Sequence, residues 1–193
     1  MSDLPNYVVI KDLDAKRPPV LSQVAEEISF PLSLEDLSVI KTLEAKFDAE
    51  ENCAGLAAPQ IGFGKQIIVF AVEPNQELKK WRPDLIQTMP KTIWINPTFE
   101  AVGEDTHTDY EGCFSVENLA GPVARYKTIR YSANLINGTK VEGRASGFLA
   151  RVIQHEIDHL RGQCFIDLVE PNELYTIEEY RKLRAQAMEK GRE

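Results

Sequence analysis

Two histidines four residues apart, with a glutamate beside the first, are the residues of this chain best suited to chemistry. His155, Glu156 and His159 form an H-E-x-x-H pattern. On a helix, at about 100° per residue, the two histidines lie about 40° apart around the axis and one turn apart along it. Both imidazoles can therefore reach one metal ion. Glu156 shares their sector, where it could take a proton from water and deliver it to a leaving amine.

The alternative for such a pair is a solvated helix surface, because a bare H-E-x-x-H pattern also occurs without a metal. Here the flanking positions are apolar, at Val152, Ile153, Ile157 and Leu160. Burying an unpaired histidine or glutamate among such residues would be costly. The chain has only three histidines, and the third, His107, lies in a polar stretch where a surface position is expected. These observations favour the metal site.

A metal with two histidine ligands needs at least one more protein ligand and an open position for water. Cys113 is the favoured candidate, because Gly112 beside it permits an unusual backbone approach. A thiolate together with two imidazoles suits zinc or Fe(II). Cys164 lies in an apolar run and is expected in the core, whereas Cys53 precedes a loop and is ambiguous. The abundant carboxylates remain as alternative ligands.

A loop of small and apolar residues, 53–62, has the sequence CAGLAAPQIG. One interpretation is the tight packing of a turn against a sheet. The functional interpretation is that small side chains let a substrate backbone approach, while the Gln60 side chain offers N–H donors to an oxyanion. Both interpretations stay open at the level of these residues.

The helices that must position these residues are predicted from periodicity and capping signals. They are expected at 33–50, at 146–162 and from 176 onwards. The first and last begin with residues in capping-box spacing, Ser33 with Asp36 and Thr176 with Glu179. Ser146 is expected to cap the middle helix, which carries the H-E-x-x-H pattern.

Strands are predicted at 66–72, 92–96, 126–135, 139–143 and 164–169. Pro97 is expected to end the second of these, and Asn137-Gly138 to form a two-residue hairpin turn. The charged segment 73–91, with its three prolines, is expected to be a surface excursion. This order of elements predicts an α+β fold with an antiparallel or mixed sheet.

Composition limits the class of protein. The chain has 193 residues, with 22 Lys and Arg against 30 Asp and Glu, a net charge of −8. We expect one domain spanning 1–193, and the negative charge argues against direct DNA binding. No stretch approaches about 18 consecutive apolar residues, and no export signal is evident, so a membrane segment is not expected. The three cysteines suit a reducing compartment, and a cytoplasmic location is expected.

Three stretches taken together resemble the peptide deformylase family, metallo-amidases that remove the N-formyl group from nascent bacterial proteins. The family pattern has a Gly-x-Gly-Leu-Ala-Ala-x-Gln loop, a Glu-Gly-Cys-Leu-Ser segment and a Gln-His-Glu-x-Asp-His-Leu helix. These correspond in order to 53–60, 111–115 and 154–160 of this chain. The resemblance extends from about residue 20 to about 170, and three ordered motifs are far more specific than any one of them.

The resemblance implies β-sheets packed around a central metal-binding helix, with an N-terminal and a C-terminal helix. It implies that Cys113, His155 and His159 hold one divalent ion, usually Fe(II) in the cell and often Zn(II) or Ni(II) in isolated protein. Metal-bound hydroxide would attack the formyl group of an N-terminal formyl-methionine, with Glu156 as general base and acid. The resemblance therefore implies a hydrolase that processes N-termini during protein biosynthesis.

The resemblance also assigns the groups that bind substrate. The Gln60 side chain and the backbone N–H of Phe114 would hold the formyl oxygen. The main chain around Ala54 and Gly55 would hydrogen-bond the extended substrate. The N-formylated nascent peptide is thus the implied partner, and the ribosome is a candidate for a second one.

Several positions depart from the family pattern. Cys53 replaces the first glycine of the loop, Phe114 replaces a leucine, and Glu117 replaces a common proline. Arg151 stands where many relatives have an aliphatic residue lining the methionine pocket, and Phe148 nearby is also bulky. If both point into the pocket, formyl-methionine fits poorly. If Arg151 extends to the pocket rim, which we favour, the floor stays apolar.

Two other functions are compatible with parts of the sequence. A deformylase-like protein with an altered substrate preference, or one that binds a ligand without turnover, would explain Cys53, Phe148 and Arg151. Another metallo-amidase or a zinc protease would explain the H-E-x-x-H pattern alone, but the cysteine segment and the glutamine loop argue against it.

Overall fold

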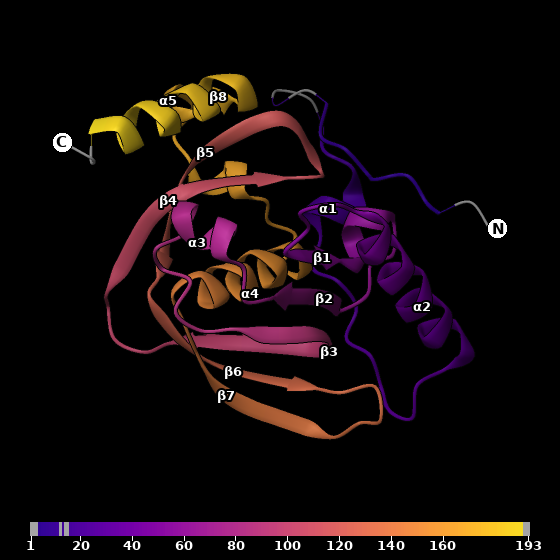
Figure 1. The fold of residues 1–193 in the computed structure, drawn as a ribbon. Helices are drawn as coiled ribbons and strands as arrows, with labels where there is room; N and C mark the ends of the chain where they lie inside the picture. Colours follow the sequence, from indigo (N-terminus) through magenta and orange to yellow (C-terminus); the bar gives the residue numbers. More distant parts are fainter. Residues whose placement is uncertain (1–3, 12, 14–15, 191–193) are drawn as a thin grey trace.

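The protein is described by a computed structural model that covers residues 4–11, 13 and 16–190, with side chains up to residue 186. This part of the chain forms an α+β fold, as the order of elements predicted. At its centre lies helix α4 (Gly147–Leu160), which carries the H-E-x-x-H pattern. Figure 1 shows α4 between two layers of antiparallel strands.

The larger layer is a five-stranded antiparallel sheet in the described residues. Its strands, in spatial order, are β1 (Gly55–Ala57), β2 (Ile67–Val72), β3 (Met89–Ala101), β6 (Thr128–Asn134) and β7 (Lys140–Ser146). Alternate residues of β2 face opposite sides, so Ile68 and Phe70 join the apolar cluster around α4, whereas Ile67 and Val69 join the cluster around α2. The sheet is therefore covered by a helix on each face.

The prediction that Pro97 ends this strand is wrong, because β3 continues to Ala101. Its pairing with β6 shifts between Ile95 and Thr98, and Asn96 in between has a φ of 50°. The Asn96 side chain binds the backbone N–H and carbonyl of Ile28, at 2.9 and 2.8 Å. Pro97 thus lies at a bulge, where its missing N–H does not interrupt the ladder.

The predicted hairpin is confirmed as β6–β7, but its turn is longer than two residues. The Leu135 N–H donates to the Thr139 carbonyl and the Gly138 N–H to the Leu135 carbonyl, each at 2.9 Å. These bonds enclose the three residues 136–138. Gly138 has a φ of 81°, which glycine adopts without steric cost.

The smaller layer is a three-stranded antiparallel sheet in the described chain, of β4 (Thr106–Cys113), β5 (Val116–Tyr126) and β8 (Tyr175–Thr176). Strands β4 and β5 form a long hairpin in which Cys113 pairs with Val116. Phe114 and Ser115 make the tight turn between them. The cysteine therefore sits at the very end of a strand, next to a turn.

Helix α2 (Leu34–Ala49) confirms the prediction at 33–50. Its capping box is present, with the Asp36 N–H donating to Ser33 Oγ at 3.1 Å and the Ser33 N–H to Asp36 Oδ2 at 3.0 Å. Figure 1 shows α2 flanking β1 and β2, on the opposite side of the sheet from α4.

Helix α4 begins after Ser146, as predicted, but the Ser146 side chain does not cap it. Its hydroxyl instead lies 3.1 Å from the Thr128 hydroxyl, which links β6 and β7 at this end of the sheet. The helix ends at Leu160, two residues before the predicted stop at Gly162. Gly162 has a φ of 74°, and its N–H donates to the His159 carbonyl in the turn that follows the helix.

The prediction of a strand at 164–169 is wrong, because this segment forms the 3₁₀ helix η2 (Phe165–Leu168). The Asp167 carboxylate accepts the Cys164 N–H at 2.8 Å, and the Asp167 N–H donates to the Cys164 carbonyl at 2.9 Å. This local pairing closes a turn in an apolar run that periodicity alone assigns to a strand.

The terminal helix α5 (Ile177–Lys190) begins with the predicted capping box of Thr176 and Glu179. The remaining elements are short: α1 (Pro19–Ser22), η1 (Ala58–Ile61), α3 (Gln76–Trp81) and η3 (Pro171–Glu173). Helix α3 lies at the surface, as expected for 73–91, although Arg82 and Leu85 after it are buried. None of the helices described has the length and apolar character needed to cross a membrane.

Candidate metal centre

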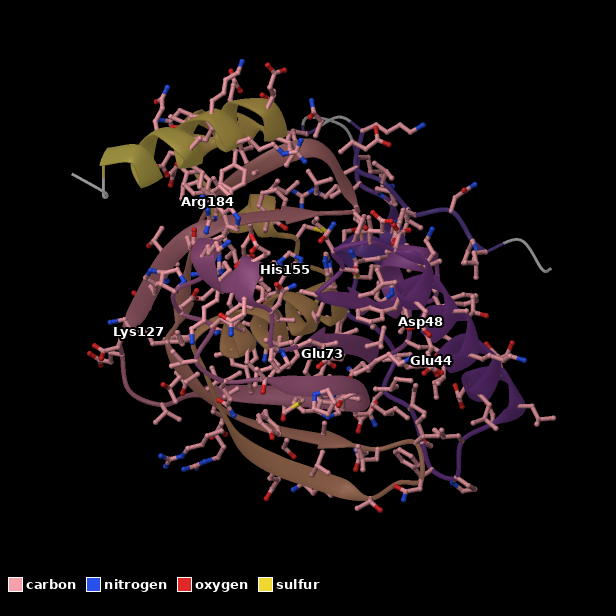
Figure 2. The ribbon with its side chains drawn as sticks, in the orientation of Figure 1. Glu44, Asp48, Glu73, Lys127, His155 and Arg184 are labelled. Carbon is pink, nitrogen blue, oxygen red and sulfur yellow. The ribbon has the colours of Figure 1, made fainter. Side chains whose placement is uncertain are left out.

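Helix α4 and the end of β4 bring together three side chains that could hold a metal ion. The ligand atoms of Cys113, His155 and His159 all lie within 4.8 Å of one another. Cys113 Sγ is 3.3 Å from His159 Nε2. In Figure 2, His155 lies near the centre of the molecule, inside the exposed side chains of Asp48 and Lys127. The three residues that the sequence proposed as ligands are therefore neighbours in space.

The Cys113 sulfur is surrounded by hydrogen-bond donors. Gln60 Nε2 donates to it at 3.2 Å and the Ser115 N–H at 3.4 Å. The side-chain oxygen Oε1 of Gln60 accepts a hydrogen bond from the Ala57 N–H at 2.8 Å. This bond fixes the side-chain amide with its NH₂ group toward the sulfur. Such donors stabilise a thiolate, which is the form of cysteine that binds metals.

His155 is oriented by a buried carboxylate on β4. Its Nδ1 donates to Glu111 Oε2 at 2.8 Å, which leaves Nε2 as the nitrogen free to bind an ion. Burial opposes ionisation of Glu111, but hydrogen bonds from His155 and Arg125 hold its pKa well below its ordinary value. Glu111 is therefore an anion beside a candidate metal ligand.

His159 has a different environment, because its second nitrogen faces the apolar core. Its Nδ1 lies 3.8 Å from Cys164 Sγ. Burial lowers the pKa of His159 well below its ordinary value, so the ring is neutral, as metal binding requires. Burial raises the pKa of Cys164 to about 12, which keeps this thiol protonated. Cys164 is a core residue, as the sequence predicted.

Glu156 has a buried carboxyl group with one oxygen that accepts no hydrogen bond from the described residues. Only 4% of the residue is exposed, and Oε2 has no hydrogen-bond partner among the described residues. Burial raises the pKa of Glu156 to about 7. Strand β1 covers the carboxyl so closely that a Cβ atom at Gly55 would collide with Oε1. A carboxyl group held this way can exchange a proton near neutral pH.

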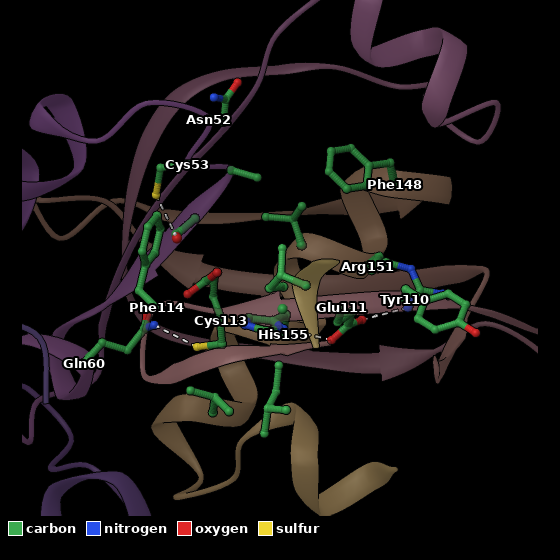
Figure 3. A pocket seen from close by; sticks show the side chains of 18 of the residues that line it. Asn52, Cys53, Gln60, Tyr110, Glu111, Cys113, Phe114, Phe148, Arg151 and His155 are labelled. Atoms are coloured by element: carbon green, nitrogen blue, oxygen red, sulfur yellow. Dashed lines mark hydrogen bonds and ion pairs between the residues drawn. The ribbon is translucent and has the colours of Figure 1, made fainter. Parts of the chain in front are cut away.

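A cavity of about 710 Å³ is lined by five of the residues described above, Gln60, Glu111, Cys113, His155 and Glu156. Figure 3 shows Cys113, His155 and Glu111 between two ends of the cavity, with Cys53 and Phe114 at one and Phe148 and Arg151 at the other. At the first end, the Phe114 ring stacks on Tyr7 with 4.9 Å between ring centroids, and Cys53 Sγ donates to the Gly55 carbonyl at 3.2 Å. The substrate-side residues proposed from the sequence thus surround one space.

The expectation that Arg151 extends to the pocket rim is wrong. The residue is 4% exposed, and its guanidinium donates to Glu111 Oε1 at 2.7 Å. It also donates to the carbonyls of Val123 and His107, at 2.9 and 2.6 Å. The acceptors come from β4 and β5, which sequence patterns could not place against α4. Phe148 does line the cavity, under the Arg82 guanidinium at 4.4 Å.

Sequence reasoning missed the buried ion network behind the candidate ligands. Arg125 donates to both oxygens of Glu111, at 3.0 and 2.9 Å, and also binds the Asp158 carboxylate. Glu111 and Asp158 lie inside the two motifs that contain the ligands, which was the available signal. His107 is exposed, as expected, and takes part through its backbone only.

Comparison with known proteins agrees with this geometry. The family model of polypeptide deformylase matches residues 10–174. Peptide deformylase 2 of Rickettsia conorii is 58% identical over 188 residues, which cover 96% of this chain and 93% of that protein. Peptide deformylase 1 of Bordetella pertussis is 44% identical over 117 residues, 61% of this chain and 64% of that protein.

Solved structures of similar proteins show the same fold. A class I type b peptide deformylase from Acinetobacter baumannii, with Met-Ala-Ser bound, superposes with a TM-score of 0.73 at 27% identity, covering 88% of this chain and 100% of that one. The peptide deformylase of Ehrlichia chaffeensis has a TM-score of 0.73 at 24% identity, covering 98% and 97%. The chain therefore belongs to the polypeptide deformylase family.

Proposed function

We propose that this peptide deformylase, as one catalytic domain, removes the formyl group from the N-terminal formyl-methionine of nascent polypeptides. The observation that carries the proposal is that the unpaired Glu156 carboxyl lines the same cavity as Cys113 and His155, two members of the triad that His159 completes. Family membership supplies the reaction class, hydrolysis of an N-formyl amide.

The triad fits one divalent ion. Cys113 Sγ, His155 Nε2 and His159 Nε2 would hold it, and we propose Fe(II) in the cell, with zinc or nickel as replacements in isolated protein. The donor set supports this choice, because one thiolate and two neutral imidazoles suit these metals. When bound, such an ion supplies Lewis acidity, which polarises the formyl carbonyl and makes water nucleophilic at neutral pH.

Glu156 would carry the proton through the reaction. Its free Oε2 takes a proton from the attacking water as the new C–O bond forms. The same oxygen then delivers the proton to the amine nitrogen as the C–N bond breaks, so that formate and a free N-terminus are the products. A pKa of about 7 lets the group accept and release a proton at the same pH.

Two donors would stabilise the charge that develops on the formyl oxygen. Gln60 Nε2 already points toward the metal ligand Cys113, and its amide is locked by the Ala57 N–H. The Phe114 N–H lies in the tight turn directly after Cys113. Fixed donors of this kind are effective because they need no reorganisation during the reaction.

The substrate backbone would bind along β1. This strand lies at the edge of the five-stranded sheet, and Ala54 and Gly55 line the cavity. An extended peptide can add to such an edge through main-chain hydrogen bonds. Phe148 and the buried stem of Arg151 would then form the wall of the pocket for the first side chain.

The test is formate release from a short formyl-Met peptide by protein loaded with iron or nickel, compared with Glu156→Ala. We expect the variant to lose about 10²–10⁴-fold in kcat while retaining its metal. Glu117→Ala is the matched control, because Glu117 also lines the cavity but lies outside the triad. No formate from fully loaded wild-type protein would overturn the proposal and favour ligand binding without turnover.

Two further proposals follow from a nascent chain as substrate. The ribosome is the proposed partner, and the cytoplasm the proposed location, because formylated chains must be met as they are made. Co-sedimentation of the protein with ribosomes at physiological salt tests the first proposal. Activity without any association with ribosomes would contradict it.

A further inference from the structure

We propose that Arg151 is a positioning residue of the metal centre, which acts through Glu111 on His155. The sequence placed Arg151 at the substrate pocket, but its guanidinium contacts the carboxylate that orients a ligand. The inference rests on the proposed role of His155 as a metal ligand. It assigns the guanidinium of this arginine a task other than binding substrate, whereas the stem lines the cavity.

The Arg151 guanidinium donates to four protein acceptors through Nη1 and Nη2. It donates to Glu111 Oε1 at 2.7 Å and to the carbonyls of His107, Val123 and Asp109, at 2.6, 2.9 and 3.4 Å. Only 4% of the residue is exposed, and a buried charge is costly unless it is paired and hydrogen-bonded. These partners therefore compensate for the burial of the Arg151 charge. Glu111 is the one carboxylate that it pairs with in the described part of the chain.

Glu111 divides its two oxygens between its partners. Oε1 accepts from Arg151 Nη1 at 2.7 Å and from Arg125 Nε at 3.0 Å. Oε2 accepts from Arg125 Nη2 at 2.9 Å and from His155 Nδ1 at 2.8 Å. Two cations on Oε1 fix the plane of the carboxylate, and this plane directs Oε2 at the histidine. Charged hydrogen bonds give this orientation both strength and direction.

The path from Arg151 to the ligand is therefore two hydrogen bonds long. Arg151 and His155 lie one turn apart on α4, and Glu111 on β4 bridges them. Arg125 cannot fully replace Arg151, because it also binds Asp158. Partners behind a ligating histidine set its ring orientation, and their loss typically weakens metal binding about 10–100-fold.

The experiment measures zinc transfer from the loaded protein to a chromophoric chelator, in the wild type, Arg151→Met and Arg151→Lys. We expect Arg151→Met to lose zinc about tenfold faster, at the lower end of that range. Lysine keeps one donor for Glu111, so Arg151→Lys should be intermediate. The cobalt-substituted proteins give a second readout, because a displaced histidine changes the visible absorption of the cobalt.

Arg82→Met is the matched control. Arg82 is also a buried arginine of the cavity, but it binds Asp109 and Asp84 and not Glu111. We expect it to retain zinc at the wild-type rate. Adding Arg151→Met to Glu111→Gln should not accelerate zinc loss any further, because the arginine acts through the carboxylate.

Zinc loss at the wild-type rate from Arg151→Met, with an unchanged cobalt spectrum, would overturn the inference. A change confined to KM for a formyl-Met peptide would do so as well and would return Arg151 to the substrate pocket. Wild-type protein that holds zinc but releases no formate would refute the proposed function and leave this inference standing. Wild-type protein that binds no zinc would refute both.

Discussion

The two sides of helix α4 are packed in opposite ways. Toward the five-stranded sheet, Leu149, Ile153 and Ile157 are at most 2% exposed and belong to one apolar cluster. Toward β4 and β5, the helix presents Arg151 and Asp158 to the charged side chains of those strands. Apolar contacts are strong but have no direction, whereas hydrogen-bonded ions fix angles.

The apolar and ionic sides of α4 therefore have different effects, one on the stability of the fold and the other on the geometry of the metal centre. The apolar side holds the helix against the sheet, and the ionic side determines where the His155 ring points. The network contains two carboxylates, Glu111 and Asp158, and two guanidinium groups, Arg125 and Arg151, so its charges balance. A balanced buried network is costly to break at one member, even where it adds little net stability.

The largest effect is expected from Glu111→Gln, which breaks the ionic side. Two buried cations would then face the single anion Asp158, and the free energy of unfolding should fall by about 3–5 kcal/mol. Metal affinity should fall about 10–100-fold, because His155 loses its oriented acceptor. Urea denaturation of the metal-free protein and competition with a chelator measure the two effects separately.

The double variant Glu111→Gln with Arg151→Met is the control for charge balance. It leaves the pair of Arg125 and Asp158, so unfolding should require more urea than for Glu111→Gln alone. Metal affinity should stay weak. A double variant no more stable than the single one would show that unpaired charge is not the cause.

The apolar side is tested by Ile153→Ala. This side chain is fully buried at the centre of the cluster, and its truncation should cost about 3 kcal/mol of unfolding free energy. The zinc affinity of the folded protein should remain within about twofold of the wild type, since no partner of a ligand is touched. A loss of affinity as large as that of Glu111→Gln would contradict the division between the two sides.

The two cysteines beside His159 provide a smaller contrast. Cys164→Ser places a hydroxyl in an apolar cluster and should cost about 1 kcal/mol of stability, with zinc retention unchanged. Cys113→Ser should release zinc far faster, because it removes the soft ligand. Competition with a chelator measures the zinc affinity of both variants. Tight zinc binding by Cys113→Ser would exclude Cys113 as a ligand.

The smallest effect is expected at an ion pair far from both sides of α4. Lys65 and Ser33 hold the pKa of Asp36 at about 2, below the ordinary value of 3.8. The ionised Asp36 carboxylate therefore stabilises the folded state fully above about pH 4, and this contribution is lost as the pH falls toward 2. At pH 7, Asp36→Asn should cost about 1 kcal/mol through the capping box of α2.

Thermal unfolding of metal-free wild type and Asp36→Asn, from pH 7 to pH 2, measures this difference. The two curves should converge in acid. A constant gap across the range would mean that the charge of Asp36 contributes nothing, and that its shape alone matters to the cap.

Local signals predicted the elements whose residues determine their own conformation. The capping boxes at Ser33 and Thr176 and the hairpin at Gly138 act through neighbours in sequence, and all three are present. The segment 164–169 was misassigned because Asp167, a single polar residue in an apolar run, closes a turn that periodicity does not register.

The site divides in the same way. Spacing on a helix could predict that His155 and His159 share a face, and the structure brings Cys113 to them. The position of the Arg151 guanidinium could not be predicted, since its partners come from two strands about 28–44 residues away in sequence. The position of a long charged side chain depends on acceptors that are distant in the sequence. Sequence periodicity does not identify those acceptors.

The 3.3 Å approach of Cys113 to His159 joins residues 46 positions apart, and Gln60 reaches the same sulfur across 53 positions. A ribosome makes the chain from its N-terminus, so the cysteine is synthesised well before the histidines. With the proposed ligands, metal affinity arises only when α4 has been made and has packed on the β4–β5 hairpin, and it then adds to the free energy of folding. An enzyme that acts on unfinished chains must itself be finished through α4 before it can hold its metal.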